Sequence, residues 1–336
     1  MVLFNWVHEF LSNPASHPHQ VKRGYYNINY LVQYDAERYV IRVPIANVQS
    51  MDQAYLNENE VLNMLQDRGY RAPRFLWKDE HFSVHSYIDS RVVDDIFPEG
   101  SALPDWIIQD LAQQTAVLHK LNSDFSNSLV TVWSVADHVR MLYDRYANSL
   151  KDLFDEFQFP NRVQIVPTDI THGARTSLGT VFAHCDIHRS NVIFAEDYFS
   201  RPVLTIIDWE QAKIAPIEYD LATQFHKSGY TQEQEQIFLN EYTKNYQTSD
   251  EINIDALIEL IGIYKKLEAI KSAIVDTVRT LDKVQRGGVT PHQITIFEKK
   301  LVAAHRVWHG VGSDAVVFFS IEDVYSILSK YSKVEV

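Results

Sequence analysis

The chain has 336 residues, of which 46% are apolar and 22% are charged. This length and composition predict a globular protein with two domains or lobes and a well-formed core. The 44 aspartate and glutamate residues outnumber the 31 lysine and arginine residues, which gives a formal net charge of −13. Such a charge disfavours non-specific binding to nucleic acid; it would suit a cationic substrate, although many proteins are acidic for solubility alone.

Cysteine content and hydropathy bear on where the protein works. Cys185 is the only cysteine, so no intrachain disulfide can form, as is usual in a reducing compartment. The first residues lack the basic segment and the apolar run of a signal peptide, and no apolar stretch approaches the roughly 20 residues that span a bilayer. We therefore expect a cytoplasmic protein with neither a membrane nor a nucleic acid as its partner.

The first part of the chain alternates between strand and helix patterns, and the rest is mainly helical apart from one strand-rich segment. β-branched and aromatic residues mark the strands, and apolar residues at helical spacing mark the helices. In the first part, we predict a helix at 1–15, a loop at 16–21, strands at 29–34 and 39–43, a helix at 53–65, and short strands near 75–77 and 82–88. In the rest, we predict a helix that begins at Pro104 and further helices within 134–157 and 251–285. We also predict an irregular insertion at 158–180 and strands within 181–209.

The sharpest chemical signal lies in this strand-rich segment. The order is His-x-Asp-x-x-x-x-Asn at 184–191, followed by a predicted hairpin that leads to Asp208. Phosphoryl transfer needs one carboxylate near the attacking hydroxyl, and a second carboxylate and an amide oxygen that hold Mg²⁺ against the phosphates. Asp186 fits the first role, and Asn191 and Asp208 fit the second. A bare His-x-Asp is common, but the complete set favours a phosphotransferase over a buried strand pair with polar turns.

The segment 184–191 and the Ile-Asp-Trp-Glu at 207–210 resemble two motifs of the aminoglycoside phosphotransferase and choline kinase superfamily. The catalytic loop of that superfamily looks like His-Gly-Asp-Leu-His-Pro-Gly-Asn, and its metal motif looks like Ile-Asp-Trp-Glu. The resemblance implies that Asp186 is the catalytic residue and that Asn191 and Asp208 are the metal ligands.

Three nearby residues complete the expected site. We place His184 with Asp186 in the catalytic loop, where it is expected to fix the loop rather than to carry a proton. Asp220, in the Tyr-Asp-Leu-Ala at 219–222, matches the Asp-Leu-Ala that begins a helix in the family, and we expect it to be structural or to face the substrate. Glu210 is a further substrate-binding candidate, because it could receive a cationic amine, although helix surfaces carry such residues anyway.

The chain also departs from the family pattern in the catalytic loop. Cys185 replaces the usual glycine, and Arg189 and Ser190 replace Pro-Gly. These changes leave the four key residues, Asp186, Asn191, Asp208 and Arg42, intact. Arg189 is near enough in sequence to contact phosphate or acceptor, but we expect it to face solvent.

The resemblance implies an α+β, protein-kinase-like fold of two lobes, with a small antiparallel sheet in the N-terminal lobe and a larger, mainly helical C-terminal lobe. The composition shifts near residue 90, so we place the nucleotide-binding lobe at 1–90 and the catalytic and acceptor-binding lobe at 91–336. The expected cofactors are Mg²⁺ and ATP, with GTP as an alternative.

Arg42 is the expected phosphate-binding residue of the N-terminal lobe. Protein kinases place a lysine on a strand and pair it with a glutamate of the next helix to hold the α- and β-phosphates. Small-molecule kinases of this superfamily look similar, with arginine in this position. We expect Glu58 to be the partner of Arg42, with Glu60 as the alternative.

Two backbone segments are expected to complete the nucleotide site. A turn with Gly24 and Asn27 lies where the family covers the phosphates, although one glycine alone does not make a glycine-rich loop. The hinge should follow the strand at 82–88, so that backbone groups near Ser86 and Ile88 face adenine.

Together these patterns predict an ATP-dependent O-phosphotransferase that moves the γ-phosphate to a hydroxyl of a small molecule. The family motif of choline kinases more often looks like Asp-Phe-Glu, whereas this chain has Asp-Trp-Glu at 208–210. We therefore favour an antibiotic as the acceptor, aminoglycoside-like or other. A metabolic kinase of the choline, ethanolamine or homoserine type is the alternative.

Two further classes are disfavoured. A protein kinase would carry Asp-Phe-Gly and Ala-Pro-Glu, which this chain lacks, and 210–222 leave no room for a long activation segment. A non-catalytic nucleotide-binding protein with a kinase fold remains an alternative, but it would be expected to lose at least one of the four key residues, Asp186, Asn191, Asp208 and Arg42.

Overall fold

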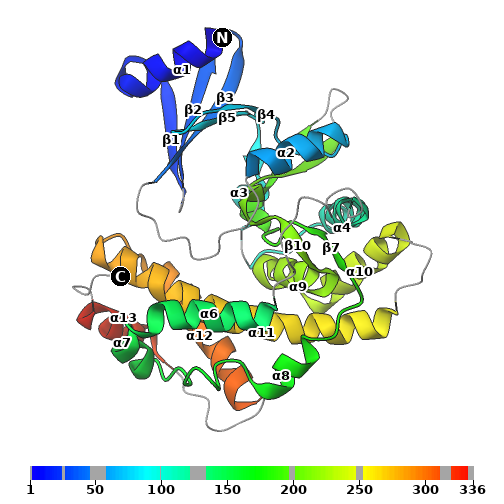
Figure 1. The fold of residues 1–336 in the computed structure, drawn as a ribbon, viewed down its shortest axis with the longest axis vertical. Helices are drawn as coiled ribbons and strands as arrows, with labels where there is room; N and C mark the ends of the chain where they lie inside the picture. Colours follow the sequence, from blue (N-terminus) through cyan, green and yellow to red (C-terminus); the bar gives the residue numbers. More distant parts are fainter. Residues whose placement is uncertain are drawn as a thin grey trace. The chain divides into compact units, whose positions relative to one another are not determined.

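The computed structural model describes most of the chain (Figure 1), namely residues 2–24, 27–45, 58–98, 100–121, 134–196, 201–246, 253–310 and 319–331. The chain forms two compact units, each built from separate stretches of sequence. The first unit comprises 1–130, 181–214 and 227–247, and the second comprises 131–180, 215–226 and 248–336. The lobe boundary near residue 90 stays a prediction.

A five-stranded antiparallel sheet in the order β1-β2-β3-β5-β4 forms the N-terminal part of the first unit. Its strands are β1 (His19–Arg23), β2 (Asn27–Tyr34), β3 (Glu37–Pro44), β4 (Phe75–Lys78) and β5 (Ser83–Ser86). The hairpin that we predicted is β2–β3, which is paired from Tyr34 with Glu37 to Asn27 with Pro44. The loop predicted at 16–21 is wrong in its last part, because β1 begins at His19 and pairs along β2. This edge strand has a mixed polar sequence without alternation, so its pairing with β2 had no local signal.

Helix α1 (Val2–Ser12) lies against one face of this sheet (Figure 1). Val7 and Phe10 of the helix are fully buried in a cluster with sheet residues that include Ile41 and Val84. Because side chains alternate along a strand, this packing directs the neighbour of Ile41, Arg42, to the opposite face. The helix therefore sets which face of the sheet is left for polar chemistry.

The first unit also contains a second small sheet and several helices. Strands β6 (Arg91–Val92), β8 (Val192–Glu196) and β9 (Pro202–Ile206) form an antiparallel sheet in which β8–β9 is the predicted hairpin. The helices are α2 (Glu58–Asp67), α3 (Val93–Ile96), α4 (Asp105–Lys120) and α10 (Gln232–Tyr246), and the 3₁₀ turns are η2 (Arg189–Asn191) and η3 (Trp209–Gln211). The predicted helix at 53–65 is described only from Glu58, and 53–57 lie outside the described residues.

The second unit is mainly helical. Its helices are α6 (Val135–Ala147), α7 (Lys151–Glu156), α8 (Thr168–Gly173), α11 (Ile254–Gln285), α12 (Pro291–His309) and α13 (Ile321–Lys330). Helix α9 (Ile217–Ser228) and the paired strands β7 (Thr180–Ala183) and β10 (Lys213–Pro216) contain residues of both units. The insertion predicted at 158–180 is irregular except for α8 and the first residue of β7. Within the described ranges, none of these helices has the length and apolar character needed to cross a bilayer.

We predict that Phe10→Ala destabilises the protein by about 3–5 kcal/mol, because it leaves a cavity between α1 and the sheet. Val21→Ala is the control, since Val21 is 51% exposed, and it should change the free energy of unfolding by less than about 0.5 kcal/mol. Urea unfolding of both variants measures the difference. Equal stability of the two variants would contradict the packing of α1 on the sheet.

Candidate active site

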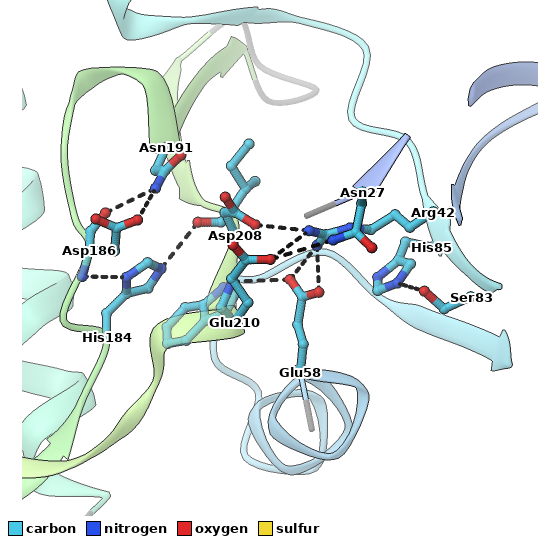
Figure 2. Close-up of polar contacts among 12 residues, drawn as sticks. Asn27, Arg42, Glu58, Ser83, His85, His184, Asp186, Asn191, Asp208 and Glu210 are labelled. Carbon is cyan, nitrogen blue, oxygen red and sulfur yellow. Dashed lines mark hydrogen bonds and ion pairs between the residues drawn. The ribbon is translucent and has the colours of Figure 1, made fainter. Parts of the chain in front are cut away.

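Arg42 ion-pairs with three carboxylates from two separate stretches of the chain (Figure 2). Its Nη1 donates to Glu58 at 2.5 Å, and its Nη2 donates to Asp208 at 3.0 Å and to Glu210 at 3.3 Å. Arg42 and Glu58 are both 13% exposed, so this pair is largely shielded from solvent. The sequence offered Glu58 or Glu60 as the partner, and the structure places Glu58 there.

The backbone explains how Glu58 reaches this position. Glu58 lies in the first turn of α2, where a carboxylate interacts favourably with the helix dipole. Val61, Leu62 and Leu65 are buried and fix the helix in place. Glu58 also accepts a hydrogen bond of 3.1 Å from the backbone N–H of Trp209, so one carboxylate contacts both Arg42 and the turn after β9.

Asp208 is held at the end of the β8–β9 hairpin by an unusual backbone conformation. Its φ of 66° lies in the left-handed region, which few residues other than glycine adopt. Trp209, which follows it, is fully buried and donates from Nε1 to the carbonyl of Ile206. The buried indole fixes the turn, and the turn aims the Asp208 carboxylate at Arg42.

The catalytic-loop residues identified in the sequence are joined by hydrogen bonds (Figure 2). The backbone N–H of Asp186 donates to His184 Nδ1 at 3.2 Å, so the other ring nitrogen, Nε2, carries the proton and donates to the carbonyl of Ile207 at 3.1 Å. Asn191 Nδ2 donates to the Asp186 backbone carbonyl at 3.0 Å and to its Oδ2 at 3.2 Å. Cys185, at the position where the family has glycine, has a left-handed φ of 60°.

One basic residue beside Asp186 was not identified from the sequence. Lys227, near the end of α9, forms an ion pair with Asp186 Oδ1, and His188 Nε2 lies 4.0 Å from the same oxygen. Burial alone would raise the pKa of Asp186, but Lys227 and then His188 outweigh it and lower that pKa to about 2. No local motif marks Lys227, because it lies 41 residues from Asp186 in the sequence.

Arg189 corrects one expectation. It does not face solvent: the side chain is buried, and Nη1 donates to the carbonyls of Phe97 and Pro98 at 2.9 Å each. Its Nε donates to the carbonyl of Ser228, at the end of α9, at 3.1 Å. The guanidinium has enough donors to bind three carbonyls in two distant backbone segments, and nothing in the local sequence pattern indicated this buried position.

The carboxylates around Arg42 carry more negative charge than it can balance. Burial and then the Asp208 carboxylate raise the pKa of Glu210 to about 8. Burial also raises the pKa of Asp208, even though Arg42 acts against this rise. For Arg42 the effect is reversed: burial would lower its pKa, but Glu58 and the other two carboxylates raise it above the ordinary value.

A cavity of about 290 Å³ lies within the first unit between the sheet and the β8–β9 hairpin. Nine of the twelve site residues proposed from the sequence line this cavity, namely Gly24, Asn27, Arg42, Glu58, Ser86, Ile88, Asn191, Asp208 and Glu210. Asp186 and His184 do not line the cavity, but each is hydrogen-bonded to a residue that does: Asp186 to Asn191, and His184 to the carbonyl of Ile207. The remaining candidate, Asp220, is buried in α9 within the second unit, so its role stays a prediction.

Three features of the cavity define what can bind there. The backbone N–H of Gly24 donates to the carbonyl of Asn27 at 2.8 Å, which closes the turn at one end. At the other end, the Ser86 N–H donates to the carbonyl of Arg74 at 2.9 Å, which fixes the backbone where β5 ends. His85, also in the lining, is neutral because burial and then the Arg42 charge lower its pKa to about 3.

The sequence and the fold were compared with known proteins. Residues 18–257 match the sequence model of the phosphotransferase enzyme family APH. A sequence search of curated proteins gave no significant match.

Several solved kinases share the fold. An ethanolamine kinase from Plasmodium vivax is 16% identical, with a TM-score of 0.58 over 98% of this chain and 85% of that chain. The choline kinase LicA from Streptococcus pneumoniae is 19% identical, with a TM-score of 0.56 over 82% of this chain and 89% of that chain. The GDP and kanamycin complex of APH(2")-IIia is 17% identical, with a TM-score of 0.57 over 88% of this chain and 98% of that chain.

Identities this low show the fold alone. The shared fold confirms the predicted α+β, kinase-like class with a small antiparallel sheet and a mainly helical remainder. The family match confirms the resemblance drawn from the catalytic loop and the Ile-Asp-Trp-Glu motif. The chain therefore belongs to the phosphotransferase enzyme family APH.

Proposed function

We propose that this chain transfers the γ-phosphoryl group of ATP, or of GTP, to a hydroxyl of a small molecule. The observation that carries the proposal is that one cavity contains both the Arg42–Glu58 pair and the Asp208 carboxylate, with Asp186 hydrogen-bonded to the Asn191 side chain at its edge. These are the parts that phosphoryl transfer requires: a cation for phosphates, oxygen ligands for a metal, and a carboxylate for the acceptor.

The nucleotide would lie along this cavity. Ser86 and Ile88 would face the base through backbone groups, and the turn of Gly24 and Asn27 would cover the phosphates. Arg42 would bind the phosphates while Glu58 keeps the guanidinium oriented. Solved relatives of the same fold were crystallised with AMP and with GDP, which supports a nucleotide site but leaves ATP and GTP both open.

The donor set fits Mg²⁺. Asp208 offers a carboxylate, and Asn191 uses its Nδ2 on Asp186, so its Oδ1 is the atom that can bind a cation. Three carboxylates surround the single guanidinium of Arg42, and burial together with the Asp208 carboxylate raises the pKa of Glu210. A divalent cation held by Asp208 and Asn191 would balance the site and neutralise charge on the phosphates.

Asp186 would orient the acceptor. The acceptor oxygen forms a bond to the γ-phosphorus, the bond from that phosphorus to the β-phosphate oxygen breaks, and the nucleoside diphosphate leaves. A carboxylate whose pKa is about 2 is a weak base, so Asp186 acts first by accepting a hydrogen bond from the hydroxyl. The hydroxyl proton passes to Asp186 or to water as the phosphorus–oxygen bond forms.

The acceptor is the finer part of the proposal. The Asp-Trp-Glu motif at 208–210 favours an antibiotic. Ethanolamine and choline kinases share the fold to the same extent as an aminoglycoside kinase, so an amino alcohol is the second candidate. A non-catalytic protein with a kinase fold is the third.

The first prediction is that Asp186→Asn abolishes acceptor-dependent turnover and leaves nucleotide binding intact, because Asp186 acts on the acceptor. ADP or GDP release is measured with Mg²⁺ for wild type and variant across aminoglycosides, nucleoside antibiotics, choline, ethanolamine and homoserine, and product mass identifies the acceptor. Turnover that persists in the variant would refute the role of Asp186. A wild type that binds nucleotide but phosphorylates none of them would support the non-catalytic alternative.

The second prediction concerns the metal. Asp208→Asn should weaken binding of Mg²⁺–ADP by at least about tenfold, the change that 1.4 kcal/mol produces. Calorimetry with and without EDTA separates the metal from the nucleotide, since binding of metal-free ADP should not weaken. If the variant and the wild type bind Mg²⁺–ADP equally well, Asp208 is not a metal ligand.

The third prediction concerns the crowded carboxylates in the absence of metal and nucleotide. Glu210 keeps a proton in the folded state up to a pKa of about 8, whereas an unfolded glutamate loses it near about 4.3. Between these values the unfolded state binds fewer protons, so this group makes the protein less stable as the pH rises.

Glu210→Gln removes this titration. The melting temperature of the variant should match that of the wild type near pH 4.5 and exceed it at pH 8. The expected excess is about 2–4 °C for each 1 kcal/mol by which the substitution raises the free energy of unfolding. Scanning calorimetry in EDTA at both pH values measures the difference. An equal difference at both pH values would show that Glu210 does not titrate in this range.

A further inference from the structure

The proposed chemistry gives no role to Lys227, although this residue contacts the carboxylate of Asp186. Its Nζ forms an ion pair with Asp186 Oδ1, and the two side chains are 30% and 17% exposed. The other oxygen, Oδ2, accepts from Asn191 Nδ2 at 3.2 Å. Each carboxylate oxygen of Asp186 therefore has its own donor, so the rotation of the carboxylate is fixed from both sides.

The position of Lys227 is itself fixed. Ser228, the next residue, ends α9, and its carbonyl accepts from Arg189 Nε at 3.1 Å. Arg189 belongs to the same loop as Asp186 and is held by the carbonyls of Phe97 and Pro98. The end of α9 is thus tied to the catalytic loop one residue away from Lys227, which distinguishes this pair from an ion pair between two mobile surface side chains.

The charges that face this carboxylate agree with an orienting role. His188 Nε2 lies 4.0 Å from Asp186 Oδ1, on the same side as the lysine. Asp208 lies with Arg42 in the neighbouring carboxylate cluster, and its carboxylate repels that of Asp186. A cation on Oδ1 therefore counteracts the repulsion between these carboxylates and holds Asp186 in place.

We propose that Lys227 is a positioning residue of the phosphoryl-transfer reaction: it holds the Asp186 carboxylate in the orientation that receives the acceptor hydroxyl. This inference rests on the proposed function, because it assigns Asp186 to the acceptor. Lys227 acts through Asp186 and contributes no ligand to the nucleotide, and it does not line the nucleotide cavity.

The test uses the full chain with Lys227→Met, which keeps the length of the side chain without its charge, and Lys227→Arg, which restores the charge. The matched control is Lys300→Met. Lys300 forms an ion pair of 2.5 Å with Asp276, and the exposed fractions of that pair, 36% and 18%, are close to those of the Lys227 pair. ADP release from Mg²⁺–ATP is measured with the acceptor that the panel selects, and with water as the acceptor if it selects none.

We expect Lys227→Met to lower kcat by about 10²-fold, the cost of a misplaced reacting group. The KM for nucleotide and the Kd for ADP should stay within about twofold, because those groups bind elsewhere. Lys227→Arg should recover most of kcat, and Lys300→Met should leave kcat unchanged while its melting temperature falls as much as that of Lys227→Met. A kcat unchanged in Lys227→Met, or equal losses in the Met and Arg variants, would overturn the proposal.

A double-mutant cycle separates this inference from the proposed function. If Lys227 acts through Asp186, then Lys227→Met has no further effect on the residual single-turnover rate or on ADP binding in the Asp186→Asn background. If the two effects add, Lys227 acts independently and the proposal is wrong, while Asp186 keeps its role. If Asp186→Asn alone retains full turnover, the role of Asp186 in the proposed function fails, and the premise of this inference fails with it.

Discussion

The ion pairs of Arg42 are the interaction on which the candidate site depends. One guanidinium joins the sheet to α2 through Glu58 and to the end of the β8–β9 hairpin through Asp208 and Glu210. Charges this shielded are costly to bury alone, so each partner needs the others to stay in place. The same excess of carboxylates is the charge that the proposed divalent cation would balance, so the electrostatics of this cluster and its proposed chemistry have one cause.

The backbone beside the functional carboxylates is also constrained. Cys185 and Asp208 both have left-handed φ values, of 60° and 66°; Cys185 precedes Asp186, and Asp208 carries the carboxylate proposed to bind the metal. Such conformations cost of order 1–3 kcal/mol each and persist only where their surroundings hold them. Here the ring of His184 does so, because it bonds the Asp186 N–H with one nitrogen and the Ile207 carbonyl with the other.

Local patterns predicted much of this structure. The β2–β3 and β8–β9 hairpins, α4 and the kinase-like class follow from periodicity and from one motif, because the signal for each lies within a short stretch of chain. Strand β1 had no such signal, since a polar edge strand depends on its neighbour for pairing. Arg189 and Lys227 were misjudged or missed for the same reason: their partners lie 39 to 92 residues away, and charge alone does not tell a surface residue from one that bridges distant loops.

Cys185 has a practical consequence. It is the only cysteine in the chain, it is 3% exposed, and it adjoins Asp186. A thiol reagent therefore has a single target, and it can reach that target only when the catalytic loop opens. The rate of modification measures how often this opening occurs, so the native chain carries its own label for following the loop as ligands bind.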